Sequence, residues 1–117
     1  MTQAHTITTL TQRADFVRLN RGRKYITDYF ILRYAAAPEA QAAFARVGYT
    51  VTTKCGNAVA RNRIKRRFRA LMREHAALTK PGMDYVLIAR ADATPSAGAA
   101  DIDALRQAFA RAFGAAQ

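Results

Sequence analysis

Hydrophobic and polar positions along the first half of the chain follow two different periods. Within residues 12–21, Phe16 and Leu19 are spaced as on one face of a helix. Residues 25–35 and 46–54 are rich in aromatic and β-branched side chains in alternation, as strands with one buried face are. In the first of these tracts, the residues expected on one face are Phe30, Leu32 and Tyr34. The pattern predicts one helix followed by strands.

Longer periodic segments occupy the second half of the chain. Residues 57–78 predict an amphipathic helix that Asn57 caps, and residues 102–114 predict another helix that Asp101 caps. The first of these helices carries a core stripe of Ile64, Phe68, Leu71, His75 and Leu78. Residues 84–92, between the helices, form a nearly continuous apolar run that is typical of a central strand. This order of elements predicts an α+β domain with helices packed on a mixed sheet.

The charge of the chain narrows its function. Its 117 residues, enough for one domain, carry 19 Lys and Arg against 8 Asp and Glu, a net charge of +11. Such an excess indicates a polyanionic partner, with nucleic acid first and an anionic membrane second. No apolar run approaches the ~20 residues of a membrane span. The N-terminus lacks the order of a signal peptide, and Cys55 is the only cysteine. We therefore expect a cytoplasmic protein without a membrane partner.

The positive charge is concentrated on the helix predicted over residues 57–78. The segment from Lys54 to Arg73 holds eight basic residues and no acidic one. A solvated helix face, the ordinary alternative, normally mixes charges of both signs. Arginine also contacts phosphate through paired hydrogen bonds and stacks on bases, which lysine does not do. These features favour a helix that binds the phosphates of a nucleic acid, whereas the amide of Asn62 fits a base edge and plain solvent equally well.

The stretch GNAVARNRIKRRFR, which begins at Gly56, resembles the RNR signature of the bacterial ribonuclease P protein subunit. The resemblance extends to LTQRADFVRLNRG, RVGYTVTTK and DYVLIAR, although Thr53 stands where many members carry a second lysine. It implies an αβββαβα sandwich similar to a ribosomal-protein domain, with a mixed four-stranded sheet and a left-handed βαβ crossover. We expect one domain over residues 1–117, with flexible ends at 1–9 and 115–117.

The resemblance also implies a function. Members assist an RNA subunit that carries the chemistry with bound magnesium, and the protein itself holds no cofactor. The residues expected to contact the RNA subunit are Lys54, Asn57, Arg61, Asn62, Arg63, Lys65, Arg66, Arg69 and Arg73. The protein also contacts the 5′ leader of precursor tRNA, a single strand of the kind that aromatic side chains beside basic groups bind. The residues expected in the leader cleft are Phe16, Arg18, Phe30, Arg33 and Tyr34, and each aromatic one fits the core as well.

Residues for independent catalysis are not evident in the sequence. The eight acidic residues are scattered, His75 lies on the predicted core stripe, and Cys55 has no base partner. We expect no catalytic residue and no metal site in the chain, and a monomeric protein. Two alternatives stay open. A DNA-binding regulator is disfavoured by the strand before the basic helix, whereas a ribosomal or other structured-RNA-binding protein without a role in cleavage fits the charge equally well.

Overall fold

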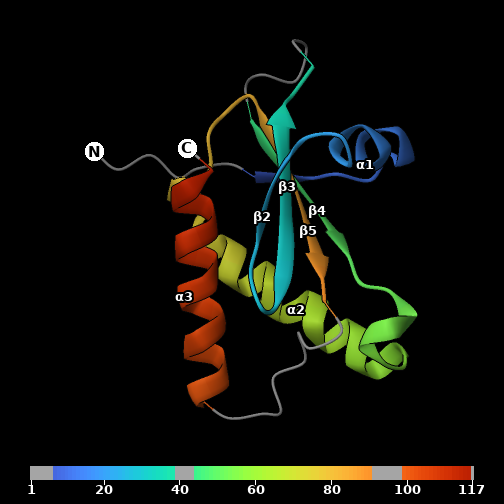
Figure 1. The fold of residues 1–117 in the computed structure, drawn as a ribbon, viewed down its shortest axis with the longest axis vertical. Helices are drawn as coiled ribbons and strands as arrows, with labels where there is room; N and C mark the ends of the chain where they lie inside the picture. Colours follow the sequence, from blue (N-terminus) through green and yellow to red (C-terminus); the bar gives the residue numbers. More distant parts are fainter. Residues whose placement is uncertain (1–6, 39–43, 91–98, 117) are drawn as a thin grey trace.

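Within residues 7–38, 44–90 and 99–116, which the computed structural model describes, five strands form one mixed sheet (Figure 1). The strands are β1 (Ile7–Thr9), β2 (Arg23–Ile26), β3 (Phe30–Ala36), β4 (Ala45–Thr50) and β5 (Met83–Ala89). The helices are α1 (Arg13–Leu19), α2 (Ala58–Glu74) and α3 (Ala99–Ala115), with 3-10 turns η2 (Thr53–Cys55) and η3 (Ala76–Leu78) on either side of α2. Helices α2 and α3 cover one face of the sheet, and α1 covers part of the other. The predicted α+β class is confirmed.

The sheet has the order β1-β4-β5-β3-β2. β3 pairs antiparallel with β2 and β5, whereas β4 pairs parallel with β5 and β1. The parallel neighbours β4 and β5 are joined through α2, the crossover element that the resemblance implies. Because β1 pairs with residues 45–47 of β4, the sheet has one strand more than expected.

Both predicted flexible ends are partly structured. Residues 7–9 form β1 at one end, and at the other α3 continues to Ala115 while Ala116 is buried. Residues 1–6 and 117, the remainder of the two ends, lie outside the described residues. The three residues of β1, Ile7–Thr9, are too few to show the alternation of a strand. The hydrophobic pattern of the sequence therefore did not predict β1.

A hairpin replaces the continuous strand predicted over residues 25–35. The Thr27 hydroxyl accepts hydrogen bonds from the backbone N–H groups of Tyr29 and Phe30 at 3.2 and 3.0 Å, which forms a turn. The Thr27 N–H donates to the Phe30 carbonyl at 2.9 Å and closes it. In the resulting ladder, Arg23 of β2 lies opposite Tyr34 of β3.

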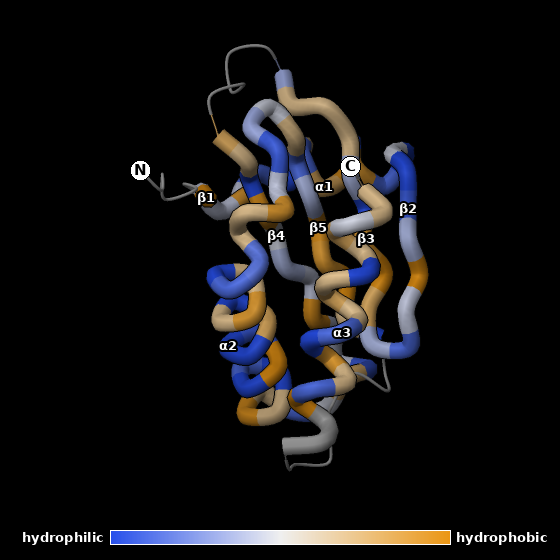
Figure 2. Tube along the Cα trace, turned by 90° about the vertical axis from the view of Figure 1, so that its left-hand side faces the viewer, coloured by the Kyte–Doolittle hydropathy of each residue, from blue (hydrophilic) through white to orange (hydrophobic). Residues whose placement is uncertain are grey.

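The main core lies between the sheet and helices α2 and α3. Phe30, Phe68 and Phe109 are fully buried, and their ring centroids lie 4.9–5.8 Å apart in edge or tilted contacts. Ile64 and Leu71 are buried beside Phe68, which confirms this part of the predicted core stripe, whereas His75 and Leu78 are half-buried beyond the end of α2. In Figure 2, hydrophobic positions recur along α2 between strongly hydrophilic ones. None of the described helices combines the length and apolarity of a membrane span.

Two helix boundaries differ from the prediction. α2 ends at Glu74 and passes into the 3-10 turn η3, so the helix predicted to residue 78 is shorter. α3 begins at Ala99, which places Asp101 inside the helix, and the predicted cap at that residue is wrong. Element ends depend on local hydrogen bonds that a hydrophobic period does not reveal.

A smaller apolar cluster attaches α1 to the other face of the sheet. Leu10, Leu19 and Val86 are buried there, and Phe16 packs against them. α1 has only seven residues, too few for a helix that is stable in isolation. Its place on the sheet therefore depends on this burial and on the ion pairs described below.

Candidate nucleic-acid interface

The start of the basic helix α2 is built by Gly56 and Asn57. Gly56 has φ 122°, in the left-handed region, and a Cβ at this residue would lie 2.9 Å from the Ala60 Cβ. The Asn57 side-chain oxygen accepts a hydrogen bond from the Ala60 N–H at 2.9 Å, so Asn57 is the predicted N-cap. That oxygen therefore serves the helix, although Asn57 was also predicted to contact RNA.

A shallow pocket of about 320 Å³ lies along α2, and we call it the arginine pocket. It is lined by five of the nine residues predicted to bind RNA, namely Asn62, Lys65, Arg66, Arg69 and Arg73. Arg63 and Lys54 are exposed but do not line it. Arg61 is half-buried, and its Nη1 donates to the Gly56 carbonyl at 2.9 Å. The nine residues predicted to bind RNA thus fall into two groups, those that line the arginine pocket and those near the start of α2.

A tyrosine lies beneath the cations of the arginine pocket. The Arg69 guanidinium carbon is 5.7 Å from the centroid of the Tyr49 ring, a cation–π contact between α2 and β4. Burial raises the pKa of Tyr49 to about 12, against the opposing positive charges of Arg69 and Arg73. The phenol therefore stays neutral and supports Arg69 from below. The sequence pattern includes Tyr49 in the strand predicted over residues 46–54 and does not connect it with the basic helix.

The positive charge on α2 is not neutralised by the described part of the protein. No described acidic side chain forms an ion pair with a basic residue of α2. Glu74, at the end of α2, accepts a hydrogen bond from Arg106 of α3 at 2.8 Å, and this bond lowers the pKa of Glu74. Arg67, which was not among the predicted residues, has a buried Nη1 without a hydrogen-bond partner. A surface of this kind attracts phosphate groups.

A cluster of charged residues lies at the other face of the sheet, between α1 and the strands. Asp84 of β5 is 0% exposed and accepts hydrogen bonds from Arg46 Nε and Nη2 at 2.8 and 2.6 Å. The hydrogen bond to Asp84 raises the pKa of Arg46. Arg18 of α1 also pairs with Asp84, and its Nη1 donates to the Ala36 carbonyl at 2.9 Å. Asp15 pairs with both arginines at 3.3 Å.

This cluster gives Arg18 a structural role in addition to the leader contact predicted for it. Its guanidinium holds α1 against the sheet through Asp84 and Ala36, while its side chain also lines a pocket along α1. Arg46, the second partner of Asp84, was not identified from the sequence, because the two residues are 38 positions apart.

Phe16 lies on the same face of the sheet. A Cβ at Gly48 of β4 would lie 2.6 Å from Phe16 Cζ, so the ring packs directly on the backbone of β4. Phe16 is half-buried, which leaves part of its ring accessible. Arg33 of β3 points to this face too, with its Nη1 donating to the Gly22 carbonyl at 3.3 Å and its Nε buried without a partner.

Phe30 and Tyr34 do not lie with Phe16, so a single leader cleft that contains all five predicted residues is wrong. Phe30 is 0% exposed in the main core, on the face covered by α2 and α3. Tyr34 points to that face as well and stacks on Tyr85, with ring centroids 6.5 Å apart. The physical reason is strand alternation, since neighbours of Arg33 along β3 must point to the opposite face.

The residues examined for catalysis make structural contacts. The described residues hold no group of three or more His, Cys, Asp or Glu side chains arranged for a metal ion. His75 Nδ1 lies 2.7 Å from the Leu71 carbonyl, and its ring lies beside Phe109. The buried Cys55 sulfur contacts the carbonyls of Ala89 and Arg90 at 3.7 and 3.5 Å.

An α+β fold with a helix of unneutralised arginine side chains over an aromatic ring defines a small nucleic-acid-binding protein. The comparison with known families then identifies which one. The chain belongs to the ribonuclease P protein family, whose model matches residues 5–117.

Curated relatives agree with this assignment. The ribonuclease P protein component of Bartonella quintana is 45% identical over 89 residues, which cover 70% of this chain and 65% of the relative. The corresponding protein of Ruegeria pomeroyi is 40% identical over 95 residues, covering 77% of this chain and 73% of the relative. The chain thus spans about two thirds of the length of such relatives, with 65% for the Bartonella protein.

Solved structures have the same fold. The RNase P protein from Thermotoga maritima superposes with a TM-score of 0.74 at 25% identity, over 88% of this chain and 92% of that one. The RNase P protein of Staphylococcus aureus superposes with a TM-score of 0.72 at 27% identity, over 90% of this chain and 96% of that one. Both superpositions cover most of the chain.

Proposed function

We propose that the chain is the protein subunit of ribonuclease P. In this role it binds the catalytic RNA subunit and the 5′ leader of precursor tRNA, and it assists the endonucleolytic cut that produces the mature 5′ end. The observation that carries the proposal is the arginine pocket on α2, whose cations have no described acidic partner, in a chain of the ribonuclease P protein family. The chemistry, with the magnesium it needs, belongs to the RNA.

The arginine pocket is the surface proposed to dock on the RNA subunit. Each phosphate that Arg66, Arg69 or Arg73 contacts releases counterions, and guanidinium groups make these contacts with two hydrogen bonds. The cation–π contact with Tyr49 already restricts the Arg69 side chain in the free protein. This side chain therefore loses less conformational entropy when it binds RNA. Asn62 at the edge of the same pocket offers a donor and an acceptor for a base or a ribose.

The leader is proposed to bind on the opposite face of the sheet, beside α1. Phe16 provides a half-exposed aromatic ring there, and Arg33 provides a cation from the neighbouring β3. Single-stranded RNA is held by such pairs of stacking and basic groups. With the two RNA surfaces on opposite sides, one small protein reaches the RNA subunit and the substrate simultaneously. A cytoplasmic location, a single domain, a monomeric protein and the absence of DNA and membrane partners stay predictions.

A charge-matched pair of variants tests the docking surface. Replacing Arg66, Arg69 and Arg73 by Gln should weaken affinity for the RNA subunit and flatten its log–log dependence on salt by about 2–3, close to one per lost phosphate contact. The control replaces Arg13, Arg90 and Arg111, exposed arginines outside α2, and removes the same charge. Equal losses in the two variants would mean that net charge, and not this pocket, binds the RNA.

The identity of the RNA separates the proposal from its closest alternative. The RNA that co-purifies with the chain should be one structured species that cleaves precursor tRNA. Recovery of ribosomal RNA instead would favour a ribosomal or other structured-RNA-binding protein.

A further inference from the structure

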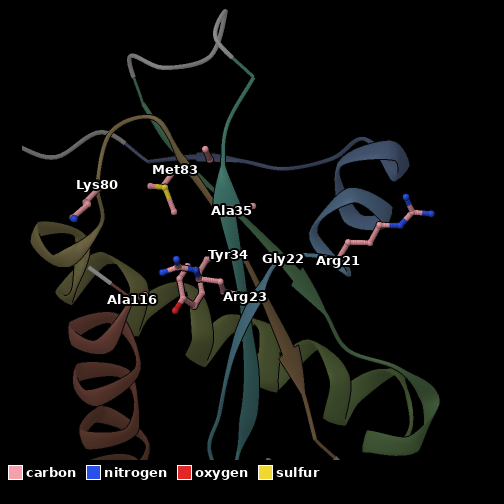
Figure 3. Close-up of a pocket in the computed structure, with 9 residues that line it drawn as sticks. Arg21, Gly22, Arg23, Tyr34, Ala35, Lys80, Met83 and Ala116 are labelled. Carbon is pink, nitrogen blue, oxygen red and sulfur yellow. The ribbon is translucent and has the colours of Figure 1, made fainter.

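A second pocket, of about 480 Å³, lies at the edge of the sheet formed by β2 and β3, next to the end of α3 (Figure 3). Its lining includes Arg21, Arg23, Tyr34, Lys80, Met83 and Ala116. The volume is typical of pockets that hold a small ligand, about 300–1,000 Å³. We propose that this pocket, the edge pocket, binds one nucleotide of single-stranded RNA, with a base against Tyr34 and a phosphate between Arg23 and Lys80.

The aromatic part of the edge pocket is firmly held. Tyr34 stacks on Tyr85, which is 1% exposed and belongs to the main core. Tyr34 itself is half-buried, so the ring is supported from behind while it lines the pocket. An aromatic ring fixed in this way is a platform for a base, because stacking does not then require the ring to be ordered on binding.

Arg23 is placed beside this ring by the sheet. It is the cross-strand partner of Tyr34, and Figure 3 shows both side chains on the same side of the β2–β3 pair. Gly22 makes this close approach possible, because a Cβ there would lie 2.6 Å from the Tyr34 carbonyl oxygen. The same figure shows Arg21 directed away from Tyr34, so Arg21 contributes charge at the rim only.

Lys80 lines the pocket from a constrained turn. Lys80 to Met83 form a β-turn that the Met83 N–H to Lys80 carbonyl bond closes at 3.1 Å, with Pro81 second and Gly82, at φ 85°, third. The Lys80 N–H also donates to the Tyr85 hydroxyl at 3.1 Å. The backbone that carries the Lys80 ammonium is thus tied to the tyrosine pair on the pocket floor.

The charge of the edge pocket points to an anionic ligand. None of its lining residues is acidic, and neither Arg23 nor Lys80 forms an ion pair with a described acidic residue. Two cations and an aromatic ring in one pocket match the phosphate and the base of a nucleotide. The choice of RNA as the ligand class rests on the proposed function.

The groups proposed to hold the ligand in the edge pocket differ from those of both surfaces of that function, although Gly22 of the pocket accepts a hydrogen bond from Arg33. The edge pocket shares no lining residue with the arginine pocket, and Tyr34 points to the opposite face of the sheet from Phe16. It therefore adds a third RNA contact, suited to a single-stranded nucleotide and built on Tyr34, Arg23 and Lys80, which belong to neither proposed surface.

Titration of the full chain with a pentaadenylate RNA, followed by amide NMR shifts, tests the inference. The backbone amides of Gly22, Ala35 and Met83 should shift on binding. The Arg23→Gln, Lys80→Gln double variant and the Tyr34→Leu variant should each weaken the binding reported by these amides about tenfold, the lower part of the range for one stacked base. The control is the Arg13→Gln, Arg111→Gln double variant, which loses the same charge at exposed residues outside the pocket and should bind within about twofold of wild type.

Two results would overturn the inference: pocket amides that do not shift when the oligonucleotide saturates the protein, or an Arg23→Gln, Lys80→Gln variant that matches the control. Far-ultraviolet circular dichroism confirms that each variant is folded, and the Tyr34→Leu variant retains an apolar side chain on Tyr85. The proposed function is tested on other residues and another RNA, namely Arg66, Arg69 and Arg73 with the RNA subunit. Either claim can therefore fail while the other stands.

Discussion

The orientation of Phe16 depends on the absence of a side chain at Gly48. Its ring occupies the space that a Cβ on Gly48 would fill, and Leu10 and Val86 pack around it. One side of the ring is therefore buried against β4, and what remains accessible is a surface on which a leader base can stack.

Phe16→Leu should separate stacking from packing. Leucine retains apolar contact with the cluster under α1 but has no aromatic face. The binding free energy for precursor tRNA should therefore become weaker by about 1–3 kcal/mol. Affinity for mature tRNA, which has no leader, should barely change. Thermal unfolding verifies that the variant is folded, and a folded variant with full preference for the precursor would remove Phe16 from the leader site.

Tyr49 offers a test of the arginine pocket that needs no RNA. Its pKa is raised from 10.0 to about 12, chiefly by burial, so the neutral phenol is favoured in the folded protein. The stability that this contributes is fully present below pH 10 and is lost as the pH rises to 12. The difference in absorbance titration between wild type and Tyr49→Phe isolates this residue among the five tyrosines.

Arg69→Gln should raise the pKa of Tyr49 further, because it removes a positive charge that lowers it. Arg13→Gln, away from α2, should leave it unchanged. A lower Tyr49 pKa in the Arg69 variant would show that the cation is not seated on the ring.

At the scale of elements, the short helix α1 depends on the charge cluster around Asp84. This carboxylate is 0% exposed and is bonded to Arg46 and Arg18, whose side chains are 14% and 33% exposed. Removing one partner of a buried ion pair leaves uncompensated charge. Asp84→Ala should therefore destabilise the protein by about 3 kcal/mol, the lower part of the range for buried pairs, since both arginines reach some solvent.

Denaturant unfolding measures this loss, and Glu74→Ala is the matched control. Glu74 pairs with Arg106 between α2 and α3, but both side chains are exposed and the pair is screened by solvent, so its removal should cost far less than the loss of Asp84. If Asp84→Ala cost no more than the control, α1 would be held by apolar burial alone.

Elements whose hydrophobic pattern repeats over many residues were predictable from the sequence. Elements whose position depends on single polar contacts were not. The core stripe predicted for α2 repeats over several turns, and Ile64, Phe68 and Leu71 are buried as the pattern predicts. The hairpin turn instead depends on the Thr27 hydroxyl, and α1 depends on its Arg18 meeting Asp84 of β5, 66 residues further along the chain. Such contacts are set by tertiary structure and leave no period in the sequence.

The site was predictable to a similar extent. Charge density identified α2, because eight bases without an acid in one segment is itself a strong signal. Alternation along β3 already separated Arg33 from Phe30 and Tyr34, but which face α1 would cover was not readable from that strand. The five predicted cleft residues were therefore combined on one surface that does not exist.

At the scale of the whole molecule, the sheet separates two proposed RNA surfaces. α2 presents the arginine pocket beyond one face, and α1 with Phe16 lies on the other (Figure 1). Such an arrangement suits a protein that connects two RNA molecules and leaves the chemistry to one of them. The central claim is therefore that the chain assists an RNA catalyst and does not cleave RNA by itself.

Cleavage of a precursor tRNA in the presence of magnesium tests this claim most directly. The purified chain should produce no mature 5′ end when it is incubated alone. The cognate RNA subunit should cleave faster when the wild-type chain is added, and the variant without Arg66, Arg69 and Arg73 should be needed at higher concentration for the same rate. Accurate 5′ cleavage by the chain freed of RNA, or a rate with the RNA subunit that the chain does not change, would contradict the account.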